Sequence, residues 1–332
     1  MNFTSLIRAA ALGVMLIAAT PALSQTPTLR FGLIGDLGYR PAEEPLMQNV
    51  LDDLDRNPLA FVAHVGDLSS PRFACTDELL ARRLAQFNAL AHPFVYTPGD
   101  NEWTDCHEQQ GVKGGNRLER LAAVRRTFFA GERSLGRETI PLIRQSQSAD
   151  PALQKFRENA RWSAGGVTFA TVHVPGSNNG LGHDADGDAE YAERNTANLA
   201  WLHAAFAAAR ANGSRAIMIL QQANIFPAHH PNAGAPAKDP NGFTDIRMAL
   251  EQEAAAFVKP VVLVHGDSHF FRIDKPLPQR LDRRVVAIEN FTRLELFGSP
   301  NHHWVEVRID ADDPNVFDIR QRIVAANVMK RQ

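Results

Sequence analysis

Four short apolar runs of this chain end in the same dipeptide, glycine followed by aspartate. The pairs are Gly35-Asp36, Gly66-Asp67, Gly99-Asp100 and Gly266-Asp267, whereas composition alone would give about one such pair in the whole chain. A single Gly-Asp pair is typical of a turn or a helix N-cap. Because the carboxyl ends of parallel strands meet at one edge of a sheet, the set of four predicts carboxylates that converge there.

Apolar runs alternate with segments of helical periodicity from residue 28 to about residue 265, which predicts an α/β fold with a parallel or mixed sheet. The expected strands are Leu29–Ile34, Phe61–Val65, Phe94–Tyr96, Val167–Val174, Ala216–Leu220 and Val261–Val264. Helices are expected around residues 46–54, 77–90, 117–129, 191–210 and 245–257. Residues 130–160 are Arg-rich and irregular. After residue 270, the runs at 285–289, 293–297, 303–309 and 316–324 predict antiparallel strands that complete a sheet.

Composition narrows the class of ligand. The chain has 332 residues, of which 44% are hydrophobic and 22% charged, and its net charge is -2. These values exclude a disordered chain and a membrane bundle. They also predict no nucleic-acid-binding surface, because no basic field exists to hold a polyanion. A charged ligand must therefore be bound by local groups.

The first residues have the pattern of an export signal. Arg8 precedes an apolar run from Ala9 to Leu23 that ends in small residues, so residues 1–24 are interpreted as a cleaved signal peptide. An uncleaved anchor is the alternative. Residues 25–332 are then expected to form a single domain, periplasmic or secreted, with no membrane span after cleavage. The sequence does not indicate an oligomeric state.

The chain has two cysteines, Cys75 and Cys106. In an oxidising compartment they are expected to form a disulfide, since no other pairing is available, and two buried free thiols are the alternative. On the chain-entropy model the bridge would stabilise the protein by about 3–4 kcal/mol.

Four converging carboxylates require positive charge. Like charges a few ångströms apart force one another to protonate unless cations neutralise them. Other metal-ligand types stand nearby in the sequence: His269 follows Asp267 by two positions, Asn101 follows Asp100, and Gln222 ends a strand. This set suits one or two ions of iron, manganese or zinc.

With these motifs in this order, residues 29–275 resemble the calcineurin-like metallophosphoesterases, the superfamily that includes the purple acid phosphatases. That family carries Asp-x-His, Gly-Asp-x-x-Asp, Gly-Asn-His-Asp/Glu, a lone His after a strand, and Gly-His-x-His. The corresponding segments here are Asp36-Leu37-Gly38, Gly66-Asp67, Gly99-Asp100-Asn101-Glu102, Gln222 and Gly266-Asp267-Ser268-His269. The resemblance implies a four-layer sandwich of two mixed β-sheets flanked by α-helices, and an exported enzyme that hydrolyses a small phosphorylated substrate by attack of a metal-activated hydroxide.

The resemblance also implies a ligand set. Asp36, Asp67 and His269 would hold one metal ion, and Asp67 would bridge to a second. The second ion would be held by Asp67, Asp100, Asn101, Gln222 and Asp267. The expected catalytic residues are Asp67, as the bridging ligand, and Asn101, at the position of the family's catalytic histidine. If the alignment of Gly99–Glu102 with the family motif is shifted by one residue, Asn101 becomes the metal ligand instead. Both Asp100 and Asn101 are expected to line the site.

Because four positions lack the histidine of the family pattern, a second, non-catalytic function is also considered. Gly38, Asn101, Gln222 and Asp267 stand where the family has histidine. A site richer in oxygen favours harder ions such as manganese or magnesium. Because asparagine cannot donate a titrating proton, the leaving group would be protonated by water, Glu102, His173 or His265. The alternative function is a degenerate, non-catalytic relative that binds a metal or a phosphorylated ligand.

Several other polar residues have two interpretations. His173 ends a strand and opens a loop that contains Asn178 and Asn179. These residues are candidates for substrate binding, although a turn explains the Asn and Gly residues of the loop equally well. His64 and His265 are interpreted as core or supporting histidines, and the His229-His230 and His302-His303 pairs as surface residues. The acidic run at 183–190 lacks the spacing of a calcium loop and is interpreted as a solvated loop. Gly266-Asp267-Ser268 is not taken as an esterase nucleophile, because no later Asp-x-x-His follows.

Overall fold

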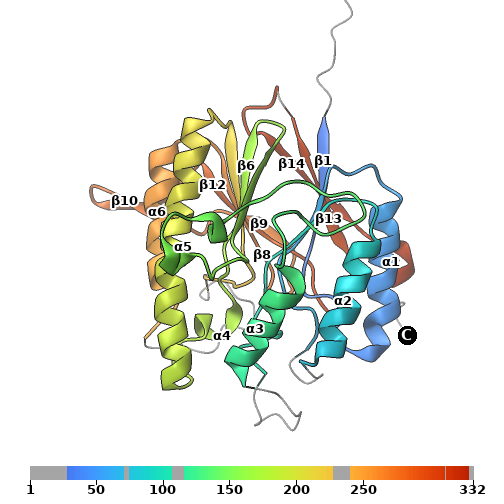
Figure 1. The fold of residues 1–332 in the computed structure, drawn as a ribbon. Helices are drawn as coiled ribbons and strands as arrows, with labels where there is room; N and C mark the ends of the chain where they lie inside the picture. The colour runs from blue at the N-terminus through green and yellow to red at the C-terminus, as the bar shows by residue number, and fades with distance from the viewer. Residues whose placement is uncertain (1–27, 71–74, 107–115, 227–239, 311, 329–332) are drawn as a thin grey trace, which may run out of the picture.

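Two β-sheets pack face to face between two layers of helices (Figure 1). The computed structural model describes residues 28–70, 75–106, 116–226, 240–310 and 312–328. The main helices are α1 Glu44–Asp55, α2 Asp77–Ala89, α3 Arg117–Phe128, α5 Ala185–Ala211 and α6 Thr244–Phe257, with a short α4 at Gly176–Asn179. Helices α5 and α6 lie on one side of the sheets, and α1 and α2 lie on the other.

The first sheet is mixed and has five strands in the order β14-β13-β1-β2-β3. Strands β1, β2 and β3 run parallel, whereas β13 and β14 are antiparallel to their neighbours. The bounds are β1 Leu29–Ile34, β2 Val62–His64, β3 Phe94–Tyr96, β13 Trp304–Ile309 and β14 Phe317–Arg322.

The second sheet is also mixed and has seven strands in the order β4-β5-β6-β7-β8-β12-β9. Strands β6, β7, β8 and β12 form its parallel centre. The bounds are β4 Ile143–Arg144, β5 Ala160–Ala164, β6 Val167–Thr171, β7 Ala216–Leu220, β8 Val261–His265, β9 Arg272–Asp274 and β12 Phe291–Glu295. A separate hairpin pairs β10 Pro278–Leu281 with β11 Arg284–Ala287.

Three hydrophobic clusters hold the four layers together. One cluster fills the space between the sheets and includes Phe31, Phe61 and Phe169, whose rings contact one another. The other two pack α1, α2 and α3 on the first sheet and α5 and α6 on the second. Strands buried on both faces are mostly apolar, as in β7 and in β8 before its final His265, which explains why these runs could be recognised in the sequence. The expected sandwich of two mixed sheets flanked by helices is confirmed.

Two predictions about the strands were wrong in detail. The run at 293–297 was expected to be antiparallel, but β12 pairs in parallel with β8, and β13 and β14 join the other sheet. The 130–160 segment was expected to be irregular, but β4 lies within it, and β5 follows directly. Strand β5 alternates buried Ala160 and Trp162 with more exposed residues, a pattern too short to stand out.

The acidic run at 183–190 is not a loop. Most of it forms the first turns of α5, because the Asp184 side chain caps the helix by accepting the Gly187 N–H at 2.7 Å. The Pro- and His-rich loop, with the His229-His230 pair, lies outside the described residues. Within the described parts of the chain, no helix has both the length and the apolar composition to cross a bilayer.

Cys75 and Cys106 form the expected disulfide, with their Cα atoms 6.0 Å apart. Both sulfurs contact the carbonyl oxygen of Asn101, at 3.3 and 3.4 Å. The bridge therefore supports the loop that carries Asp100 and Asn101, as well as closing a long segment of chain.

Replacing both cysteines by serine should lower the free energy of unfolding by about 3–4 kcal/mol, because the unfolded chain regains the entropy that the bridge removes. Urea denaturation of the double variant measures this change. The wild-type protein unfolded with a reductant present should show the same loss. An unchanged midpoint in both experiments would contradict the prediction.

Candidate metal centre

Three of the four Gly-Asp pairs bend the chain at the aspartate. Asp36, Asp67 and Asp267 have φ values of 56°, 62° and 74°, and His269 has 64°, all in the left-handed region. Such a backbone is unfavourable for residues other than glycine, and clusters of it are typical of functional sites. The bend turns each side chain inward from the end of its strand.

Two of the four glycines make room for the carboxylate of another pair. A Cβ atom at Gly266 would lie 1.8 Å from Asp36 Oδ2, and one at Gly99 would lie 2.0 Å from Asp67 Oδ1. No side chain fits in either place. At these two positions, the glycine of one pair therefore leaves space for the aspartate of another.

Asp36, Asp67 and His269 come together, as the sequence predicted. One ligand atom from each lies within 4.8 Å of the others. Asp36 Oδ2 is buried and has no hydrogen-bond partner among the described residues. His269 Nδ1 donates to the Ser299 carbonyl oxygen at 2.6 Å, and Nε2 lies 3.4 Å from Asp36 Oδ1. Nε2 is therefore the ring atom that would bind a cation, after losing its proton. Two carboxylates and an imidazole suit a transition-metal ion.

Tyr39 also contacts these three residues, and the sequence did not predict its place in the site. Its hydroxyl donates to Asp67 Oδ2 and lies 3.2 Å from Asp36 Oδ1 and 3.0 Å from His269 Nε2. The phenol oxygen therefore stands among the three candidate ligands and could serve as a fourth. The available signal was its position three residues after Asp36 in a chain with only three tyrosines.

Burial and neighbouring charges shift the pKa values of several groups in the site. Burial, followed by the negative charge of Asp100, raises the pKa of Asp67 well above its usual range. Burial likewise raises the pKa of Asp267 to about 6. Burial alone would lower the pKa of His269, but its hydrogen bond to Asp36 and the charge of Asp36 raise it to about 9. The cluster thus favours positive charge, which a metal ion would supply by displacing protons.

Asn101 contacts Asp67 directly, and Asp100 precedes it in the same loop. The Asn101 side chain donates to Asp67 Oδ2 at 2.9 Å, and its backbone N–H donates to Asp67 Oδ1 at 3.2 Å. Asp100 Oδ2 accepts a hydrogen bond from Ser177 at 2.7 Å. Glu102 instead lies behind the loop, where it accepts from Tyr96 and the Gly99 N–H.

Asp267 and Gln222 border the same cluster. The Asp267 N–H donates to Asp36 Oδ1 at 3.0 Å, and the Asp267 carboxylate accepts the Asn224 N–H at 2.8 Å. Gln222 is completely buried, and its Oε1 accepts the Gly176 N–H at 2.5 Å. Among the described acidic residues, Asp267 does not belong to the Asp36, Asp67 and His269 group.

Arg83 fastens together the two loops that carry Asp36 and Asp67. From α2, its fully buried guanidinium donates to the carbonyl oxygens of Gly38 and Leu68, at 2.9 and 2.8 Å. Its remaining donors bind Glu44 through both carboxylate oxygens, and also Gln86. A planar guanidinium suits this arrangement, because its five donors point in fixed directions.

His302 and Glu43 hold the same loop from its other side. His302 Nε2 accepts the Gly38 N–H at 3.2 Å, and Glu43 accepts the Tyr39 N–H at 3.0 Å. The prediction that His302 and His303 are surface residues was therefore wrong, since both are buried. The predicted supporting role of His64 is observed: its Nδ1 accepts the Gly66 N–H at 3.0 Å.

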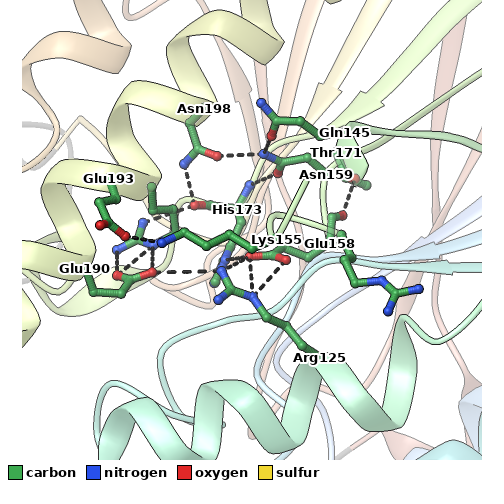
Figure 2. Close-up of polar contacts among 12 residues, drawn as sticks. Arg125, Gln145, Lys155, Glu158, Asn159, Thr171, His173, Glu190, Glu193 and Asn198 are labelled. Carbon is green, nitrogen blue, oxygen red and sulfur yellow. Dashed lines mark hydrogen bonds and ion pairs between the residues drawn. The ribbon is translucent and has the colours of Figure 1, made fainter. Parts of the chain in front are cut away.

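His173 lies in a buried polar network, away from any surface (Figure 2). Its Nδ1 is 2.8 Å from Glu158 Oε1, and Arg125 binds the same carboxylate. Burial alone would raise the pKa of Glu158, but the Arg125 charge and the His173 hydrogen bond hold it well below its usual range. In this structure the His173 imidazole is therefore held by Glu158 inside this network.

The other residue expected to bind substrate, Asn178, ties two loops together. Its Nδ2 donates to the carbonyl oxygens of Leu181 and Pro240, and its Oδ1 accepts the Gly242 N–H. His265, one of the candidate proton donors, is also completely buried. The polar ends of the Asn178 amide are thus occupied by backbone groups.

No protein-family model matches the chain, and no curated protein matches its sequence. Among solved structures, a purple acid phosphatase from yellow lupin (Lupinus luteus) seeds aligns with 94% of this chain at 14% identity and a TM-score of 0.54. The alignment covers 54% of the lupin chain, so this chain spans about half its length. At this identity the likeness shows the fold alone: this chain shares with the lupin protein a sandwich of two mixed sheets flanked by helices.

Two structures of vacuolar protein sorting 29 also align. The protein from Entamoeba histolytica has 10% identity and a TM-score of 0.29, covering 88% of this chain and 98% of its own. The protein from Cryptosporidium parvum has 10% identity and a TM-score of 0.30, covering 89% and 96%.

Arg83→Met should lower the free energy of unfolding by about 3 kcal/mol or more, because it leaves two loop carbonyls and Glu44 without their buried partner. It should also weaken binding of manganese, since the Asp36 and Asp67 loops lose their common anchor. Urea denaturation and calorimetric titration with manganese measure the two effects.

The neighbouring Arg82→Met is the matched control. Arg82 is exposed and lies 3.7 Å from the same Glu44, so its loss should change stability by less than about 1 kcal/mol. Equal effects of the two substitutions would contradict the role given to Arg83.

Proposed function

We propose that this protein is a metal-dependent phosphoesterase. The observation that carries the proposal is the convergence of Asp36, Asp67, His269 and Tyr39 at the strand ends of a metallophosphoesterase-like fold. The proposed substrate is a small phosphate ester. Manganese, iron, zinc and magnesium are all candidate ions, because the site combines oxygen ligands with one imidazole.

The proposed roles follow from the contacts of each residue. Asp36, Asp67, Tyr39 and His269 would hold a cation, which when bound neutralises charge that develops on a phosphoryl group. The Ser299 carbonyl fixes the His269 ring, and the Ser299 N–H binds the Asp36 carbonyl oxygen at 2.9 Å. Asn101 would hold Asp67 in place through two hydrogen bonds. The site is thus organised before a ligand arrives, which avoids reorganisation during the reaction.

We further propose that the protein works in an oxidising compartment, periplasmic or extracellular. The Cys75–Cys106 disulfide supports this location, because such bonds persist where thiols are not kept reduced. Residues 1–24, which would carry the export signal, lie outside the described residues.

The test is turnover of an aryl phosphate by protein stripped of metal and reloaded with each ion in turn, with bound metal measured by mass spectrometry. The expected result is hydrolysis that depends on the added ion. Asp67→Asn should lower turnover by at least about a hundredfold and reduce bound metal, because it removes an anionic ligand.

Asp186→Asn is the control, since Asp186 is exposed in the first turn of α5. It should leave turnover and bound metal unchanged. Stoichiometric metal with no turnover of monoesters or diesters would replace the proposal with a non-catalytic binding protein. Activity retained in Asp67→Asn would refute the site assignment.

A further inference from the structure

Gln222 has an orphaned hydrogen-bond donor at the edge of the candidate metal centre. It follows β7, which lies between β6 and β8 in the second sheet, and it has no exposed surface. Its Cγ lies 2.9 Å from the place that a Cβ atom at Gly66 would occupy. Because Gly66 directly precedes Asp67, the Gln222 amide lies next to the strand end that carries the central carboxylate.

One end of this amide is fixed by a backbone group. The Gly176 N–H lies 2.5 Å from Gln222 Oε1. A backbone N–H can only donate, so the atom that faces it has to be the amide oxygen. Rotating the amide by half a turn would place two donors against each other.

Gly176 cannot easily move away from this contact. A Cβ atom at position 176 would lie 2.6 Å from Asp100 Oδ2, so the backbone approaches that carboxylate as closely as a glycine can. The next residue, Ser177, donates to the same carboxylate oxygen at 2.7 Å. The Gly176 N–H is thus held in place, and with it the orientation of the Gln222 amide.

The other end of the amide has no acceptor. Gln222 Nε2 is buried and makes no hydrogen bond to any residue that the structure describes. A buried donor without a partner is costly and calls for an acceptor. An amide nitrogen has hydrogens to donate and no lone pair for a cation, so in this orientation it cannot ligate a metal.

We propose that Gln222 is an anion-binding residue, whose Nε2 donates to a phosphoryl oxygen, and is not a metal ligand. This role rests on the proposed function and corrects the ligand role that the family resemblance implied for Gln222. At the place where the family has an imidazole ligand, this chain offers a neutral donor that recognises the charged group of the substrate directly.

Two substitutions separate a donor from a ligand. Gln222→Glu keeps an acceptor for the Gly176 N–H but replaces the donor with a carboxylate oxygen. Gln222→Met removes both polar atoms at similar volume. The probes are manganese, counted per chain by mass spectrometry, and inorganic phosphate, titrated calorimetrically into the manganese-loaded protein.

Both variants should bind phosphate about 10- to 100-fold more weakly than the wild type, the loss expected for one hydrogen bond to a charged group. Gln222→Met should bind as much manganese as the wild type. Gln221→Met, which removes the adjacent buried glutamine, is the control and should keep phosphate affinity. Melting curves of all three variants show that they are folded.

A fall in manganese content in Gln222→Met would make Gln222 a ligand and overturn the inference. Unchanged phosphate affinity in both Gln222 variants would also overturn it. In either case the proposed function would stand, provided that the wild type binds manganese and hydrolyses phosphate esters. A wild-type protein that binds neither manganese nor phosphate would instead refute the proposed function.

Discussion

The mutual repulsion of carboxylates buried at the strand ends is the constraint on which this site depends. Asp36, Asp67, Asp100 and Asp267 come from four different strand ends; the first three are buried, and Asp267 is partly exposed. Their charges work against folding unless positive charge lies among them. Such an arrangement persists only when the surrounding structure holds it in place and a bound ligand stabilises it.

The surrounding structure enforces it through contacts to the backbone. Arg83 holds the carbonyl groups of two loops, and His302 and Glu43 hold the N–H groups of one of them. The Cys75–Cys106 bridge backs the loop of Asn101. These residues act on the main chain and leave the carboxylates free, so the loops keep their shape while the ligand atoms remain available to a cation.

The sequence predicted the fold well because buried strands and amphipathic helices have strong patterns. The four Gly-Asp pairs predicted that aspartates converge, and the family resemblance implied that His269 joins Asp36 and Asp67. The sequence could not predict Tyr39, because a single tyrosine in a loop has no periodicity. The burial of His302 depends on a contact with Gly38, which lies 264 positions away in the chain. The orientation of the Gln222 amide likewise depends on Gly176, which lies 46 positions away.

Thermal unfolding of the metal-free protein, with and without added manganese, tests the central claim most directly. A cation that binds only the folded state raises its stability by about 2.7 kcal/mol at a hundredfold excess over the dissociation constant. The account predicts a melting temperature several degrees higher with manganese, and a reversal of this shift by a chelator. Identical melting curves with manganese, iron, zinc, magnesium and chelator would show that the carboxylates are tolerated without a cation, which contradicts the account.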